Sequence, residues 1–210
     1  MNKVNRIEIT MRVSAAILLY VGTLALPQLS VSANDLNDNA GEQIFSKSAN
    51  GCLAPLDTSL RALHSNSEHD LCELSKGKVV MVVNTASQCG YTGQFEDLET
   101  IYREYQEQGL VILGFPSDSF RQEYADEEAT AEVCFRNFGV TFPMMATTKV
   151  TGEEANSVFQ ALTNATEQAP RWNFHKYVIS ADGTQVRSFA SPVKPTDESI
   201  TQTIESFLQQ

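Results

Sequence analysis

The chain has 210 residues, of which 42% are hydrophobic, and its formal net charge is −11 at pH 7. This length and apolar content fit one packed domain with an appendage. So acidic a chain offers no basic surface for nucleic-acid phosphates or anionic lipid headgroups, and the composition argues against both kinds of partner.

The first 33 residues have the pattern of a secretory signal peptide. Basic residues precede an apolar run over 13–26, Pro27 closes that run, and small residues follow up to Ala33. We expect cleavage after Ala33 and export to a periplasm or the outside of the cell. The alternative is an uncleaved anchor, but the run is shorter than the roughly 18 residues that a membrane-spanning helix needs. We therefore expect no stable membrane insertion.

Residues 34–50 are mostly polar and are predicted to be a flexible start of the mature chain, followed by a single domain over 51–210. A continuous apolar, mostly β-branched run over 79–83 predicts a strand buried on both faces. An apolar stripe from Phe95 to Tyr105 predicts a helix, and a second buried strand is expected over 110–115. Strand, helix and strand in this order predict a βαβ unit with two parallel strands.

Three more helices are predicted, over 129–138, over 154–162 and around Ile200 to Leu208. Between the second and third of these, strand-like runs over 176–179 and 184–189 flank Ala181-Asp182-Gly183, which favours an antiparallel hairpin. The sum predicts an α/β fold with a central mixed sheet flanked by helices on both faces.

The chain has four cysteines, Cys52, Cys72, Cys89 and Cys134. In an exported protein an even number suggests disulfides, and three full pairings are possible. The sequence has no CxxC motif, and neither the cysteine spacing nor the placement of His64, His69 and His175 resembles a zinc site. We expect no metal and no cofactor.

Cys89 occupies the loop between the first predicted strand and the first predicted helix. Ligands of open α/β sheets bind at the carboxyl ends of strands, and the helix N-terminus favours a thiolate, which is the nucleophilic form. This position therefore predicts a reactive cysteine. The alternative is a small buried hydrophobic residue, a role that free cysteines often have.

Four ordered motifs resemble those of glutathione peroxidases and span roughly 77–207. They are Asn84–Thr92 around Cys89, Gly114–Ser117 with Phe120 and Gln122-Glu123, Gly139–Met144, and Arg171–Tyr177. The resemblance implies a thioredoxin-like fold, peroxidase activity, and a catalytic set made of Cys89, Gln122, Trp172 and Asn173. The sequence departs from the family at one place: a single residue separates Phe120 from Gln122 where two are common. The family's Gly-Gln-Glu-Pro run also reads Arg121-Gln122-Glu123-Tyr124 here.

The implied catalytic set has a clear chemical logic. The side-chain amides of Gln122 and Asn173 and the indole N–H of Trp172 are donors that can stabilise a thiolate and hold a peroxide beside it. The activation is therefore electrostatic and needs no Cys–His pair. We interpret His175 as a surface histidine without a catalytic role.

Attack of a Cys89 thiolate on a peroxide would give a sulfenic acid and water or an alcohol. Resemblance to many non-mammalian members implies that Cys134 is the resolving cysteine, which forms a disulfide that a thioredoxin-like protein or glutathione reduces. The alternative for Cys134 is a buried structural residue. For Cys52 and Cys72 the simplest use is a structural disulfide, with two free thiols or a redox relay pair as alternatives.

The sequence thus predicts a thiol peroxidase that acts on hydrogen peroxide and organic, possibly lipid, hydroperoxides. The segment from Leu162 to Trp172 is short, which favours a monomer with an open site. Three alternatives stay open. A thiol–disulfide oxidoreductase would carry a second cysteine at Thr92, a peroxiredoxin would have Pro and Thr ahead of Cys89, and a peroxide sensor would pass oxidation to a partner protein.

Overall fold

The structure, a computed structural model, describes residues 44–210. The predicted signal peptide, residues 1–33, and the first ten residues of the predicted flexible segment lie outside the described residues.

The central sheet has four strands in the order β4-β3-β5-β6. They are β3 (Val79–Thr85), β4 (Leu110–Pro116), β5 (Lys176–Ile179) and β6 (Val186–Phe189). β3 and β4 are parallel, whereas β5 is antiparallel to both β3 and β6. The structure confirms the predicted βαβ unit, the hairpin and the mixed sheet.

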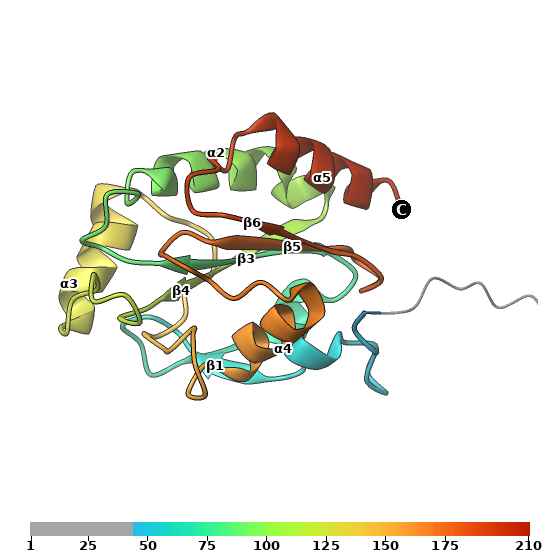
Figure 1. Ribbon diagram of the computed structural model, residues 1–210, viewed down its shortest axis with the longest axis horizontal. Helices are drawn as coiled ribbons and strands as arrows, with labels where there is room; N and C mark the ends of the chain where they lie inside the picture. The colour runs from blue at the N-terminus through green and yellow to red at the C-terminus, as the bar shows by residue number, and fades with distance from the viewer. Residues whose placement is uncertain (1–43) are drawn as a thin grey trace, which may run out of the picture. The chain divides into compact units, whose positions relative to one another are not determined.

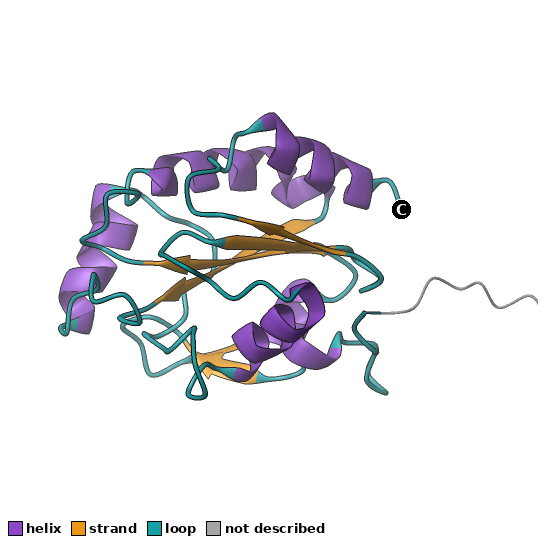
Figure 2. Cartoon of the chain, in the orientation of Figure 1, coloured by secondary structure: helices purple, strands orange, loops and turns teal. Residues whose placement is uncertain are grey.

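Helices cover both faces of this sheet, as Figures 1 and 2 show. On one face lie α2 (Gln94–Tyr105), which continues through a short 3-10 turn η2 (Gln106–Gln108), and α5 (Glu198–Leu208). On the other face lies α4 (Ser157–Thr166). The predicted start of α4 at residue 154 is three residues early, because Asn156 caps the helix by accepting from the N–H of Phe159 (3.1 Å).

Alternate residues of β3 separate two cores, because successive side chains of a strand point to opposite faces. Val79, Met81 and Val83 pack in one core with residues of α2 and α5, here called the α2–α5 face. Val80 and Val82 pack in the other with residues of α4, here called the α4 face. All seven residues of β3 are buried, which explains its continuous apolar pattern.

Cys134 lies on a helix with two parts, drawn at one end of the molecule in Figure 1. A single α-helical stretch α3 (Glu127–Ala131) passes into a π-helical stretch η3 (Glu132–Asn137). Asp126 caps the start by accepting from the N–H of Glu128 (3.1 Å). The helix therefore begins two residues before its predicted start, and its second part has wider turns that are frequent at functional sites.

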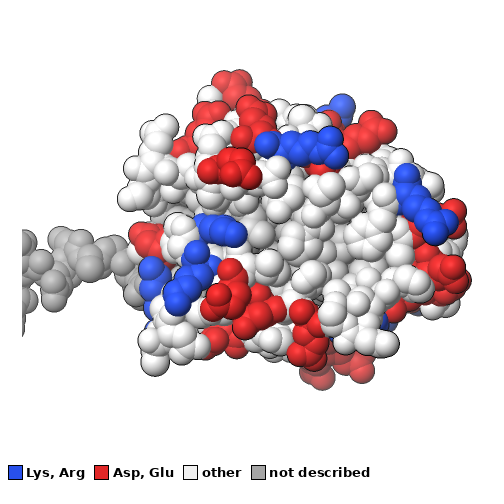
Figure 3. All heavy atoms as spheres, turned by 180° about the vertical axis from the view of Figure 1, so that it is seen from behind, with Lys and Arg blue, Asp and Glu red and all other residues white. Residues whose placement is uncertain are grey.

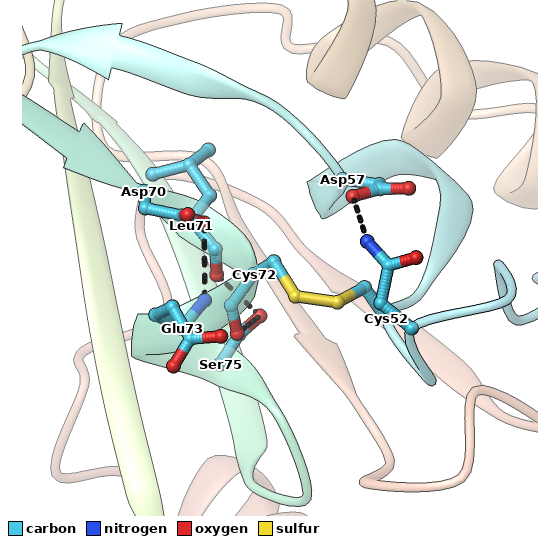
Figure 4. Close-up of a disulfide and its surroundings, with 8 residues drawn as sticks. Cys52, Asp57, Asp70, Leu71, Cys72, Glu73 and Ser75 are labelled. Carbon is cyan, nitrogen blue, oxygen red and sulfur yellow. Dashed lines mark hydrogen bonds between the residues drawn. A yellow bond between two sulfur atoms is a disulfide. The ribbon is translucent and has the colours of Figure 1, made fainter.

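The segment before β3 holds short elements that the sequence did not reveal. They are the 3-10 turn η1 (Ala54–Leu56), the hairpin strands β1 (Ser59–Arg61) and β2 (Glu68–Asp70), and the helix α1 (Leu71–Ser75). Each has three to five residues, too few for a hydrophobic period to show. A disulfide joins Cys52 to Cys72 of α1, with Cα atoms 5.4 Å apart (Figure 4).

Residues 44–50 differ from the flexible segment that we expected over 34–50. Phe45 is buried, and its N–H donates to the carbonyl of Gly183 (3.0 Å) in the β5–β6 turn. Gly183 has φ +77°, and a Cβ atom there would collide with Leu53. This start of the described chain thus packs on the domain through contacts that only a glycine permits.

Within residues 44–210, no helix combines the length and the apolar character of a bilayer span. On the face drawn in Figure 3, Lys and Arg side chains lie among Asp and Glu side chains rather than in one basic patch.

Candidate active site

Cys89 lies in the loop between β3 and α2, where the side chain of Thr92 bonds to the loop backbone. The hydroxyl of Thr92 accepts from the N–H of Cys89 (3.1 Å) and lies 2.9 Å from the carbonyl oxygen of Ala86, to which it can donate. The N–H of Tyr91 donates to Sγ of Cys89 (3.4 Å). The sulfur therefore receives a backbone donor just before the N-terminus of α2, an arrangement that stabilises negative charge on it.

Cys89 is a free thiol with 8% of its surface exposed, and it takes no part in the disulfide. It belongs to the core of the α2–α5 face, at the carboxyl end of β3.

Gln122 and Asn173 meet at this loop although 51 residues separate them. The side-chain amide of Asn173 donates to Oε1 of Gln122 (3.1 Å), and the N–H of Gln88 donates to the carbonyl of Gln122 (2.9 Å). The side-chain N–H groups of Gln122 make no hydrogen bond to another residue of the described range, so they stay available to a ligand. Oδ1 of the buried Asn173 has no partner among residues 44–210, which is unusual for a buried acceptor.

Asn84, a fully buried residue of β3, positions the segment that carries Asn173. Its amide donates to the carbonyl of Trp172 (3.2 Å), and its Oδ1 accepts from the N–H of His175 (3.0 Å). Asn84 belongs to the motif around Cys89, but this supporting role was not predicted from the sequence. Its signal was a polar residue inside a strand whose other interior residues are apolar.

Trp172 lies at the mouth of a pocket rather than in the core. Its side chain is 40% exposed, and its ring packs on Phe120 with centroids 5.5 Å apart. The pocket has a volume of about 740 Å³, and its lining includes Tyr91, Arg171 and Ser191. Cys89, Gln122 and Asn173 do not line it, so the pocket borders the candidate site and is not the site itself.

The shortened Phe120–Gln122 connection is accommodated by a left-handed residue. Arg121 has φ +57°, and its N–H donates to the carbonyl of Asp118 (3.0 Å) to close a turn. This is the position at which the family's run has Gly, the residue that adopts positive φ without steric cost. The turn still delivers Gln122 to Asn173, at the expense of strain at Arg121.

Cys134 is the second free thiol, and it is 1% exposed. Burial, and secondarily the negative charge of Glu123, raise the pKa of Cys134 to about 12. Cys89 and Cys134 belong to the same core but form no bond with each other in this structure. The Cys134 thiol is therefore protonated at neutral pH while it stays buried.

The glutathione peroxidase family model matches residues 58–163. The chain belongs to the glutathione peroxidase family. It is 42% identical over 139 residues to glutathione peroxidase-like peroxiredoxin 2 of Saccharomyces cerevisiae, which covers 63% of this chain and 85% of the yeast protein. It is 46% identical over 127 residues to a glutathione peroxidase of Lactococcus lactis, which covers 58% of this chain and 81% of that protein.

Solved structures agree with this assignment. The apo crystal structure of Trgpx superposes with a TM-score of 0.57 at 32% identity, covering 74% of this chain and 95% of that one. The crystal structure of T. cruzi GPX1 gives a TM-score of 0.57 at 28% identity, covering 74% of this chain and 96% of that one. The predicted thioredoxin-like fold is confirmed, and the chain is a peroxidase.

His175 of this peroxidase is buried, so our interpretation of it as a surface residue was wrong. It is 5% exposed, Nε2 bonds with Oγ of Ser188 (2.8 Å), and its ring lies on Tyr177 with centroids 4.8 Å apart. It directly precedes β5, so the sheet carries it inward. Burial, and then the charge of Lys176, lower the pKa of His175 to about 4.

Lys176 of the peroxidase is fully buried, and its amino group is bonded to the start of α2. Nζ donates to Oε1 of Gln94 (2.7 Å) and to the carbonyls of Ser191 (3.3 Å) and Val193 (2.5 Å). Burial lowers the pKa of Lys176 to about 7. These bonds connect the first residue of α2 to the segment after β6.

One group of potential metal ligands occurs among the described residues, Cys52, Asp57 and Cys72, whose ligand atoms lie within 4.8 Å of one another. The two cysteines are joined as a disulfide, and metals bind the thiolate form (Figure 4). In this state the peroxidase offers only the carboxylate of Asp57 there.

Proposed function

We propose that this peroxidase reduces hydrogen peroxide and organic hydroperoxides through a sulfenic acid on Cys89, which Cys134 then resolves. One observation carries the proposal: the free Cys89 sulfur accepts a backbone N–H in a loop bonded to Gln122, which is in turn bonded to Asn173. These bonds support a site in which neutral donors surround the nucleophile.

In the first step the Cys89 thiolate attacks one peroxide oxygen. The S–O bond forms as the O–O bond breaks, the sulfur is oxidised, and the other oxygen leaves as water or an alcohol after taking a proton. The free amide N–H groups of Gln122 can stabilise the charge on the leaving oxygen. The unpartnered Oδ1 of Asn173 supports this assignment, because a peroxide O–H would satisfy it.

In the second step Cys134 attacks the sulfenic sulfur, an S–S bond forms and water leaves. Cys134 must first leave its buried position, so this step needs a local rearrangement around η3. A thioredoxin-like dithiol protein, or glutathione, would then reduce the disulfide by exchange. Thr92, whose hydroxyl is bonded to the Cys89 backbone, occupies the position where a thiol–disulfide oxidoreductase has its second cysteine.

Peroxide turnover with two reductants tests the proposal. We expect Cys134→Ser to lose most of the rate driven by a thioredoxin system and to retain any rate driven by glutathione, since glutathione can attack the sulfenic acid directly. Mass spectrometry after one equivalent of peroxide should show a Cys89–Cys134 disulfide in the native protein. Equal thioredoxin-driven rates in the native protein and in Cys134→Ser would contradict the resolving role.

We extend the proposal to the range of peroxides that the protein reduces and to its location. Bulky hydroperoxides, including lipid ones, would approach the site past the pocket of about 740 Å³ beside Trp172, and we expect the protein to be a monomer. Failure to reduce a phospholipid hydroperoxide while hydrogen peroxide is reduced would contradict this. We also propose export to the periplasm or to the outside of the cell. N-terminal sequencing of the exported protein should then begin at Asn34.

A further inference from the structure

We propose that Glu123 is a positioning residue that tethers the helix of Cys134 to the loop of Cys89, and that release of this tether controls how fast the two sulfurs join. The inference rests on the proposed resolving role of Cys134. It assigns to Glu123 a function separate from that of its neighbour Gln122.

The tether consists of one carboxylate oxygen with three donors. Oε1 of Glu123 accepts from the N–H of Ser87 (3.3 Å), the N–H of Tyr124 (2.9 Å) and the hydroxyl of Thr130 (3.0 Å). Glu123 is 8% exposed and Thr130 is fully buried. A buried carboxylate held by three donors is a fixed point, because leaving any of these groups without a partner is costly.

The two outer donors belong to the two cysteine elements. Ser87 lies two residues before Cys89 in the β3–α2 loop, and Thr130 lies on α3, four residues before Cys134. Glu123 therefore connects the segments of both sulfurs through a single atom. Its charge also reaches Cys134 itself, where it adds to the effect of burial in keeping the thiol protonated.

The helix that must move is weakly built without this tether. α3 has five residues, and the stretch that carries Cys134 is π-helical. Such short or irregular segments open locally at low cost when tertiary contacts are lost. The Thr130–Glu123 bond is thus a contact that α3 has to break, or strain, before Cys134 of η3 can reach the Cys89 sulfenic acid.

The step that the tether controls joins the sulfurs of Cys89 and Cys134. The sulfenic acid of Cys89 and the thiol of Cys134 give a disulfide and one water; the sulfenic sulfur is reduced, the thiol sulfur is oxidised, and the hydroxyl leaves with the thiol proton. Peroxide attack comes earlier and does not require α3 to move. The tether should therefore act on the second step and leave the first unchanged.

Thr130→Val removes the hydroxyl donor at nearly constant volume and separates the two steps. In single-turnover experiments with hydrogen peroxide, we expect sulfenic acid formation at the native rate and disulfide formation about three- to tenfold faster, the effect of one lost hydrogen bond. A dimedone probe quantifies the sulfenic acid, and mass spectrometry quantifies the disulfide. Thr130→Ser keeps the hydroxyl and should restore the native rate.

Two further variants complete the test. Thr130→Ala removes the same hydroxyl and should show the same acceleration if Thr130→Val does not fold. Thr203→Val, on the exposed side of α5, is the matched control and should change neither step. Glu123→Gln removes the negative charge from the acceptor of both arms and should speed disulfide formation while sulfenic acid formation stays at the native rate, a split that a purely structural residue would not produce.

Two outcomes would overturn the inference, and they are distinguishable. If folded Thr130→Val and Thr130→Ala form the disulfide at the native rate or more slowly, the tether is wrong while the proposed function stands. If the native protein forms no Cys89–Cys134 disulfide at all, the resolving step fails and the inference fails with it.

Discussion

The two cysteine pairs lie in regions built in different ways. Cys52 and Cys72 are bonded to each other in the short elements before β3, next to residues that pack on the α4 face. Cys89 and Cys134 are both free and belong to the core of the α2–α5 face. The loop of Cys89 follows the buried strand β3, and the short helix of Cys134 is held to that loop by the Glu123 bonds, so these sulfurs need no covalent link to stay in place. The disulfide thus lies among the short elements before β3, whereas the free thiols lie in segments that hydrogen bonds already hold.

Serine substitutions at the two kinds of cysteine test this difference and have the largest expected effects. We expect Cys89→Ser to lose at least about 10³-fold in peroxidase rate with little change in unfolding free energy, because it removes the nucleophile. The double variant Cys52→Ser/Cys72→Ser should lose about 3 kcal/mol of unfolding free energy and keep its activity per folded molecule. Urea unfolding and a peroxide assay measure both quantities. Lost activity in the folded double variant would favour a redox relay from Cys52 and Cys72 instead.

The pH dependence of the unfolding free energy tests the packing of the α4 face, where His175 packs on Tyr177. Burial lowers the pKa of His175 from the ordinary histidine value of 6.5 to about 4 in the fold, so between these pH values the unfolded chain binds a proton that the folded chain does not. The contribution of His175 to the unfolding free energy is therefore complete above pH 6.5. About 3 kcal/mol of it is lost as the pH falls toward 4.

Urea unfolding at pH 7, 5 and 4 measures this loss. His175→Gln should flatten that part of the curve while other acid-sensitive groups still contribute. An identical slope in the native protein and in His175→Gln would show that His175 is not the group responsible.

The smallest expected effect concerns the strained turn before Gln122. Arg121→Gly should relieve the positive φ and raise unfolding free energy by up to about 1 kcal/mol, since the gain in the fold is partly offset by the freer unfolded chain. Thermal unfolding measures it, with Arg121→Ala as the control that keeps the strain. A loss of stability in Arg121→Gly would mean that the Arg121 side chain makes a contact that outweighs the strain.

Much of the fold could be predicted because its strongest signals are local. The apolar runs of β3 and β4 and the Asp-Gly turn between β5 and β6 identify their elements within a few residues. The bounds of α4 were less accurate because the capping bond of Asn156 decides where the helix begins. Motif resemblance supplied the set Cys89, Gln122, Trp172 and Asn173, but it could not supply their supports, Asn84 and Glu123, which act through contacts distant in sequence.

The sequence alone was enough to predict the order along the chain of the strands and helices from β3 onward, the α/β class and the family. Apolar periods and motif spacings are properties of neighbouring residues. Only the tertiary structure decided that Asn173 bonds to Gln122, that His175 is buried, and that one oxygen of Glu123 holds both cysteine elements. These facts depend on how the strands pair and which helix covers which face. A hydrogen bond across 51 residues leaves no trace in the local pattern of either partner.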